Sequence, residues 1–539
     1  MSVKKVIGIG LSIVLLGLNL IAAQLSLESY EDKVLGGWLG QMVGNIFGIP
    51  TEGQFIFSPG PQSLTYYQTL PSSAIADDDT FNDLVWLSAL EKYGLEFTSR
   101  DLALEWQEQI KAGDMACANY IARLNIEKGI MPPLSGHPSN NPYSLYIDAQ
   151  IEADIFGLIS PGMPDEACRY ASTMSELMCY SDGEYGARFI AAMYALAFIE
   201  DDIPTIITTA LEFIPRVSRY YEIIKASIEA YKQFPDNFKR ARSRILQKYY
   251  KSSITPSGGW VQADINGAMV VLALLYGEGD FDKTLALAVW LGLDNDCNAA
   301  TAGGIIGTII GGKRIPEKWT LPLQDLYLNG GRLKNVPYYL KITDIAKRTL
   351  DIGLKNVEKN NALFKDDLIE LPNYSIVTPD YKQPWSDDEV ASGICKGWND
   401  EWQIQNLGWD MNPGILSSYE GRTNVFASHP LNQNKPFAFV RTVTLPENKT
   451  AILKLGVTSF NGNTHPTHFE ADWLLRVYVD DKLIFEKLIA REAGKIKWYD
   501  LEVSLTEYAG KTINLRVENV PNNWSFEAAY WDYLDLEIN

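Results

Sequence analysis

The pattern of hydrophobic and polar positions divides the chain into two parts. From about residue 30 to residue 354, apolar residues recur at helical spacing, with long Ala, Leu and Val runs at 267–276 and 285–291. Small residues are frequent in these helices, as in GGIIGTIIGG at 303–312. They let helix backbones approach closely, and because charged residues precede this short run, we expect tight packing inside a globular helical domain rather than a membrane helix pair.

The last third of the chain has a different period. A polar segment with several prolines at 355–386 is predicted to be a linker. Beyond it apolar and polar residues alternate, as in LLRVYVDDKLIFEKLI (474–489) and KTINLRVENV (511–520), with turn residues between such runs. The sequence therefore predicts a multidomain protein, in which an all-α domain at 24–354 precedes an all-β sandwich at 387–539.

The first residues have the layout of a secretory signal peptide. Lys4 and Lys5 precede an uncharged, mostly apolar stretch at 6–23, and small residues stand before the first polar positions. We predict cleavage near Ala23, which removes segment 1–23 and makes the protein secreted or periplasmic, with no stable membrane span. An uncleaved anchor is the alternative, since the apolar stretch is borderline for a span.

Charge and composition narrow the function classes. The 539 residues include 67 acidic against 47 basic ones, a net charge of −20, which argues against a general nucleic-acid binder. Four His residues cannot build a His-rich centre, so any metal is expected to have oxygen ligands. Five Cys is an odd number, and a disulfide framework is not expected in a chain of this size.

Two groups of aspartates stand directly before apolar helical segments. They are Asp77, Asp78 and Asp79 in the first group, and Asp294 and Asp296 in the second. A helix N-terminus favours an anion by about 0.3–1 kcal/mol, but capping needs only one Asp. A buried carboxylate needs a partner, and no Lys or Arg follows the second group until Lys313. Divalent cations such as Mg²⁺ or Mn²⁺ would neutralise both groups; two capped helix starts are the alternative.

A glycine-rich segment lies upstream of the first aspartate group. Its glycines recur at helical spacing at positions 36, 37, 40, 44 and 48. Gly48, Pro50 and Gly53 then mark a turn that presents Glu52. Taken alone, Glu52 is a loop acid like many others.

Five segments, in this order, carry a family resemblance: GGWLGQMVGNIFGIPTEG, ADDDT, YIDAQIEADIFGLISPGMP, DGEYGARFIAAMYALAF and GLDNDCNAATAGGIIG. Through them the chain resembles the ADP-ribosylglycohydrolase family over about residues 30–350. The resemblance implies an all-α fold with a binuclear Mg²⁺ or Mn²⁺ centre that binds a ribose-like furanose and cleaves its glycosidic bond. The resemblance implies that the helical part, residues 24–354, is the catalytic domain.

The resemblance also implies roles for individual residues. By position, the metal ligands are Asp78, Asp79, Asp294 and Asp296. Glu52 matches a glutamate that assists catalysis in some members, and here we expect it to move a proton while the metals orient the sugar or a water. Substrate-binding candidates within the same motifs are Gly183, Tyr185 and Asn298.

Three positions depart from the family pattern. Asp77 stands where many members have a Thr or Ser ligand, and its carboxylate can supply the missing oxygen. Cys297 stands where Thr is common, and because a hard cation gains little from a neutral thiol, we expect Cys297 to pack rather than to ligate. Asn45 replaces a frequent Asp. Because these changes surround the metal site, another furanosyl substrate is an alternative to ADP-ribose.

Aromatic residues are frequent in the C-terminal part: Trp398, Trp402, Trp409, Trp473, Trp498, Trp524, Tyr530 and Trp531. Each alone is expected to be a core residue, although aromatic faces also stack on sugars. The segments 497–520 and 524–538 are similar to galactose-binding-like sandwich modules of extracellular glycoside hydrolases, which makes a polysaccharide a candidate partner. His465 and His468 form a candidate metal pair, but an ordinary loop is favoured.

Together these features predict a secreted, metal-dependent glycoside hydrolase whose substrate is an ADP-ribosyl or other furanosyl compound. Two alternatives remain open. One is an extracellular furanosidase that acts on a polysaccharide and has no activity on ADP-ribose. The other is a non-catalytic protein that binds glycans or nucleotides.

Overall fold

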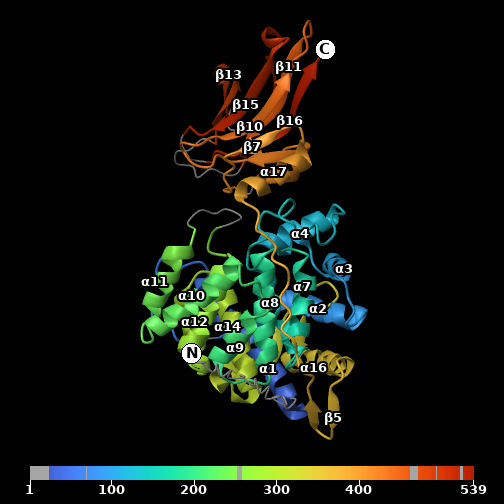
Figure 1. Ribbon diagram of the computed structural model, residues 1–539, viewed down its shortest axis with the longest axis vertical. Coiled ribbons are helices and arrows are strands. Elements are labelled where there is room, and N and C mark those ends of the chain that lie inside the picture. The colour runs from blue at the N-terminus through green and yellow to red at the C-terminus, as the bar shows by residue number, and fades with distance from the viewer. Residues whose placement is uncertain are drawn as a thin grey trace, which may run out of the picture.

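The computed structural model describes residues 23–67, 70–251, 258–411, 413–461, 471–492, 495–522 and 526–539. The predicted signal peptide lies outside these residues except for Ala23, and so do His465 and His468. A helical domain is followed by a β-sandwich, and Figure 1 shows them as two bodies joined through the segment that leads into helix α17. Within the described residues, no helix combines the length and apolar character needed to cross a membrane.

The N-terminal domain is built from helices of very different exposure. They are α1 (Leu27–Gly48), α2 (Asp78–Tyr93), α3 (Ser99–Gln109), α4 (Cys117–Glu127), α5 (Asp148–Ile151), α6 (Asp154–Leu158), α7 (Pro164–Ser175), α8 (Asp182–Leu196), α9 (Ile203–Leu211), α10 (Arg219–Gln233), α11 (Phe238–Tyr249), α12 (Ala263–Gly277), α13 (Phe281–Leu291), α14 (Asn295–Ile310), α15 (Glu317–Thr320) and α16 (Ile342–Lys359). Helices α8 and α12 are buried on every side, and only the last residue of α14 is partly exposed. These three helices form the centre of the domain, as their all-round apolar sequences require.

Helices α1 and α14 touch backbone to backbone along four turns. A Cβ added at Gly40 would lie 2.0 Å from the carbonyl oxygen of Gly303, and one at Gly44 would lie 2.0 Å from that of Ala299. At the end of α1, a Cβ on Gly48 would lie 2.2 Å from the Cα atom of Asp296. The glycine spacing seen in the sequence therefore serves an antiparallel contact that leaves no room for side chains.

The segment predicted to be a linker contains regular structure. Helix α16 extends to Lys359, and strands β5 (Leu363–Lys365) and β6 (Leu368–Glu370) form a hairpin that pairs with β1 (Gln24–Ser26). The local pattern could not reveal this hairpin, because its partner strand is more than 300 residues away in the chain. A second small sheet joins β2 (Ala74–Ile75), β3 (Leu326–Leu328) and β4 (Tyr339–Lys341).

The remaining residues up to 386 run along the helical domain and are hydrogen-bonded to it. Arg188 donates to the carbonyl oxygen of Val377 at 2.8 Å, and the amide of Lys382 donates to the hydroxyl of Tyr185 at 2.7 Å. The Trp385 ring then packs edge-on against His137, with 4.8 Å between ring centroids. The segment is thus attached to the helical domain at several points.

Two five-stranded antiparallel sheets form the C-terminal sandwich, in the orders β13-β12-β15-β10-β7 and β14-β11-β16-β9-β8. The strands are β7 (Gln403–Gln405), β8 (Gly414–Tyr419), β9 (Arg422–Ser428), β10 (Phe437–Thr444), β11 (Ala451–Ser459), β12 (Trp473–Val479), β13 (Lys482–Ile489), β14 (Tyr499–Ser504), β15 (Thr512–Val520) and β16 (Ala529–Ile538). On β12 every second residue is buried, as the alternating sequence predicts.

A helix and several tryptophans complete the core of the sandwich. Helix α17 (Asp387–Trp398), which the sequence did not reveal, places Val390 and Ile394 in this core. Trp402, Trp473 and Trp531 are fully buried there. These three aromatic residues are therefore core residues and are not available to stack on a sugar.

The contact between α1 and α14 predicts a large effect of a single methyl group. Gly40→Ala directs its Cβ at a backbone carbonyl, which cannot rotate away, and should lower the free energy of unfolding by about 3 kcal/mol. Gly113→Ala is the matched control, because a Cβ there meets nothing within 4 Å. Urea unfolding of both variants measures the effect, and equal stability of the two would contradict the close contact.

Candidate metal centre

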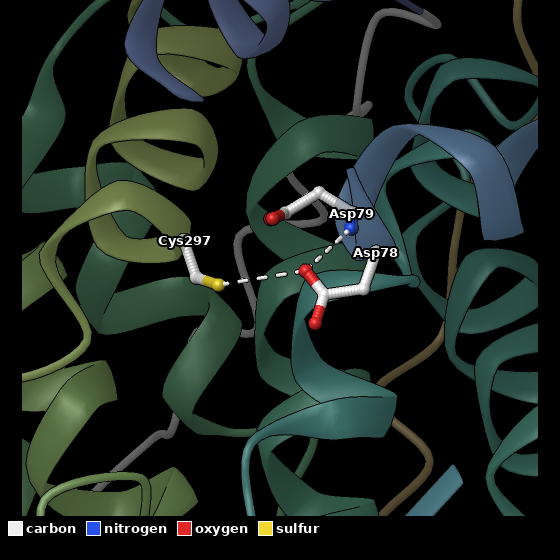
Figure 2. Close-up of side chains that lie close together, drawn as sticks. All are labelled: Asp78, Asp79 and Cys297. Carbon is white, nitrogen blue, oxygen red and sulfur yellow. Dashed lines mark hydrogen bonds between the residues drawn. The ribbon is translucent and has the colours of Figure 1, made fainter. Parts of the chain in front are cut away.

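The two aspartate groups come from the beginnings of two helices that lie far apart in sequence. Asp78 and Asp79 form the first turn of α2, while Asp294 precedes α14 and Asp296 lies in its first turn. Ligand atoms of Asp78, Asp79 and Cys297 lie within 4.8 Å of one another, and those of Asp294, Asp296 and Cys297 do so too. Figure 2 shows the Cys297 sulfur facing the carboxylates of α2. The structure thus brings both groups together, and we call these four aspartates and Cys297 the acidic cluster.

The positions of both helix starts are fixed by the end of α1. The Asn45 side chain on α1 donates to Asp77 Oδ2 at 2.8 Å and to Asp79 Oδ2 at 3.5 Å. Asn295 at the start of α14 donates to Thr51 Oγ1 at 2.8 Å, just beyond α1 in the short helix η1 (Ile49–Thr51). Helix α1 therefore holds α2 on one side and α14 on the other.

Burial dominates the electrostatics of the acidic cluster. It raises the pKa of Asp78, Asp79 and Asp294 well above the ordinary value, and mutual repulsion among the carboxylates raises it further. The pKa of Asp296 is raised to about 7, chiefly by burial and then by Glu52. Among the described residues, no Lys or Arg is one of the groups that chiefly shift these four pKa values.

The acidic cluster has oxygen atoms without hydrogen-bond partners. Asp79 Oδ1 and Asp296 Oδ1 are both buried and unpartnered in the described structure. A buried polar atom without a partner is costly, and unpartnered carboxylate oxygens within a cluster of aspartates are the kind of donor that a hard divalent cation binds. The residues present therefore fit a divalent metal ion, and Asp77 Oδ2 lies next to them through the shared Asn45.

Glu52 lies near the acidic cluster. It follows η1 and is exposed to solvent. Partial burial and the charge of Asp77 raise the pKa of its carboxyl group, and its own charge raises the pKa of Asp294 and Asp296. Glu52 is therefore accessible from solvent and close enough to the aspartates to interact with them.

The three substrate-binding candidates lie in different surroundings. The Asn298 side chain donates to Asn266 Oδ1 at 2.8 Å, one turn after Asp294, and its own Oδ1 atom is buried without a partner. Tyr185 is buried and its hydroxyl accepts from the Lys382 amide. Gly183 packs against Ser144 and Cys179. Among the described contacts, only those of Asn298 lie beside the acidic cluster.

Asp148 is an acidic residue of this region that the sequence analysis did not single out. It is buried, its Oδ1 accepts from the Asn119 amide at 2.9 Å, and its Oδ2 has no hydrogen-bond partner in the described structure. Burial raises its pKa to about 7, and its charge raises the pKa of Asp78. Its only sequence signal was its place in the YIDAQ segment, which is part of the family resemblance.

A further pair of buried acids lies at Gln41, four residues before Asn45 on α1. Gln41 on α1 donates to Asp83 Oδ2 at 2.8 Å and to Asp154 Oδ2 at 3.0 Å, and the Tyr194 hydroxyl also donates to Asp154. Burial raises the pKa of Asp154 to about 8 and that of Asp83 well above its usual value. Asp154 also raises the pKa of Asp79, so Asp154 acts electrostatically on the acidic cluster.

The raised pKa of Asp154 predicts a pH-dependent effect of Asp154→Asn. Between about pH 4 and about pH 8 the native carboxyl group stays protonated while the unfolded one ionises, so this group lowers wild-type stability as the pH rises. The Asn variant lacks this group and should gain stability relative to wild type over that range, by at most roughly 1.4 kcal/mol per pH unit. Urea unfolding of the metal-free proteins measures the difference. Asp114→Asn, at an exposed site, is the control, and a pH-independent difference for Asp154→Asn would contradict the prediction.

Comparison with known proteins identifies the family of the helical domain. A family model described as ADP-ribosylglycohydrolase matches residues 26–355, which is more than half of the chain. A solved structure described as an ADP-ribosylglycohydrolase-related protein complex is 16% identical, covers 61% of this chain and 99% of its own, and has a TM-score of 0.44. The CBM51 domain from Clostridium perfringens GH95 in complex with methyl-galactose is 16% identical over 25% of this chain and 88% of its own, with a TM-score of 0.18. No curated protein matches the chain. The family match shows that the chain belongs to the ADP-ribosylglycohydrolase family.

Proposed function

We propose that the protein is a metal-dependent glycoside hydrolase that cleaves a ribosyl or ribose-like furanosyl bond. The acidic cluster is the observation that carries this proposal. Four aspartates gather there, two of them with a buried, unpartnered oxygen (Asp79 and Asp296), and no Lys or Arg is among the described groups that chiefly shift their pKa values. Family membership supports hydrolysis of a glycosidic bond as the use of such a centre.

The cation ligands in this proposal are Asp77, Asp78, Asp79, Asp294 and Asp296. Carboxylate oxygens suit Mg²⁺ or Mn²⁺, and the negative charge of the two aspartate groups is large enough to balance two divalent ions. A bound cation supplies Lewis-acid polarisation and a fixed anchor for sugar hydroxyls or water. Asn45 holds Asp77 and Asp79 in place, and Asn298 offers a free amide oxygen beside the same cluster.

Glu52 is proposed to move the proton. Glycosidic cleavage passes through a state that resembles an oxocarbenium ion, and a carboxyl group with a raised pKa can give or take the proton of that step. Such a group needs a raised pKa and access to the substrate side. The pKa of Glu52 is raised, and its side chain is exposed to solvent. Its position near Asp77 and Asp296 would place the transferred proton beside the bound sugar.

The substrate class depends on where the protein acts. A cleaved signal peptide would place it outside the cytoplasm, and the appended β-sandwich is a candidate site for a polysaccharide. An extracellular furanosidase without activity on ADP-ribose is therefore the second candidate. It is favoured by the departures at Asp77 and Cys297, because both residues lie at the acidic cluster.

A hydrolysis screen tests this proposal. Mature protein supplied with Mg²⁺ or Mn²⁺ should release ADP-ribose from ADP-ribosylated protein or a free pentose from furanosides, and a chelator should abolish the release. ADP-ribose as the product selects the first candidate, and a pentose selects the second. Tight binding of these compounds without any product would instead indicate a non-catalytic binding protein.

Removing one carboxylate charge from either helix start should abolish turnover. Asp79→Asn and Asp296→Asn each keep the shape of the side chain but weaken cation binding, so activity should fall roughly 100-fold or more. Helical circular dichroism should be unchanged, because neither carboxylate forms an ion pair in the described structure. Asp114→Asn is the exposed control. Full activity in both cluster variants would rule out the metal centre.

Glu52→Gln separates proton transfer from cation binding. The amide cannot exchange a proton, so kcat should fall by about 10²–10⁴. Cation affinity, measured by calorimetry, should stay within a few-fold of wild type because the five proposed ligands are intact. An unchanged kcat would exclude Glu52 as the proton-transferring group.

A further inference from the structure

Cys297 is the one described residue whose ligand atom belongs to both halves of the acidic cluster. Its sulfur lies within 4.8 Å of carboxylate oxygens of Asp78 and Asp79, and equally within 4.8 Å of those of Asp294 and Asp296. The thiol donates to Asp78 Oδ1 at 3.9 Å, as Figure 2 shows. A residue expected only to fill space thus places its polar atom between the carboxylates.

The Cys297 side chain is held in this position by its surroundings. It is 3% exposed and packs against Ile147 and Ile151, which lie at the two ends of α5. Because these apolar residues contact the side chain, the sulfur has little freedom to turn away. The expectation of packing is therefore met, but it describes only part of what the residue does.

The unpartnered oxygens provide a second and independent indication of a ligand. Asp79 Oδ1 and Asp296 Oδ1 are buried in side chains that are 0% and 3% exposed, and neither has a hydrogen-bond partner in the described structure. A donor set of carboxylate oxygens plus one sulfur differs from the all-oxygen set that Mg²⁺ prefers. Sulfur ligands favour softer cations such as Zn²⁺ and Co²⁺.

We propose that Cys297 is a direct ligand of a thiophilic divalent cation, so that the centre also accepts Zn²⁺ or Co²⁺ and is not restricted to Mg²⁺ or Mn²⁺. This inference rests on the proposed metal centre and adds the identity of one ligand and a class of cation. On binding, the S–H bond breaks, a sulfur–metal bond forms, and the proton passes to water.

Cobalt binding provides a readout that does not depend on activity. Titration of the full-length mature protein with Co²⁺ should produce the near-ultraviolet thiolate-to-cobalt charge-transfer band. Cys297→Ser should lose this band and bind Co²⁺ and Zn²⁺ at least about 10-fold more weakly, while its Mg²⁺ affinity stays within a few-fold of wild type. Cys117→Ser and Cys168→Ser, which alter thiols outside the acidic cluster, should keep the band.

X-ray absorption of the zinc-loaded wild-type protein gives a second measurement that needs no variant. The proposal expects one sulfur neighbour at about 2.3 Å together with oxygen neighbours. A shell of oxygen and nitrogen alone would overturn it, as would a cobalt band that persists in Cys297→Ser.

The two proposals fail in distinguishable ways. Binding of Mg²⁺ or Mn²⁺ without a sulfur–metal signal removes Cys297 as a ligand and leaves the hydrolase proposal intact. If none of these four cations binds, both proposals are wrong.

Discussion

Helices α1 and α14 lie so close that a Cβ added at the glycines of α1 would meet the backbone of α14, and the position of the acidic cluster depends on this contact. The approach of Gly48 to Asp296 joins the end of one helix directly to the beginning of the other. Asn45 then ties the end of α1 to the first aspartate group, and Asn295 ties the start of α14 back to Thr51. One dense helix pair therefore positions residues that lie more than 200 positions apart in sequence.

This arrangement concentrates negative charge in a buried place. Burial and repulsion both raise the pKa of the aspartates, and the nearby Asp154 adds to the repulsion on Asp79. A fold that only needed stability would replace such groups by apolar residues. The retained carboxylates, their unpartnered oxygens and the exposed Glu52 beside them are instead what cation binding and proton transfer require.

Several parts of the structure could be predicted from the sequence, because their signals are local. The change of period separated the helices from the sandwich, and the aspartate groups marked two helix starts. Other parts depend on distant partners. The hairpin β5–β6 exists because it pairs with β1, and Asp148 gains its importance only when α5 packs against Cys297. For Cys297, residue type alone indicated packing, whereas the structure also places its sulfur among the carboxylates.

Locating a bound cation tests the metal centre most directly. Anomalous diffraction from crystals soaked in Mn²⁺ reports the position of the ion without relying on turnover. We predict peaks bounded by Asp78 and Asp79 on one side and by Asp294 and Asp296 on the other. Saturating Mn²⁺ with no peak between the starts of α2 and α14 would contradict this prediction.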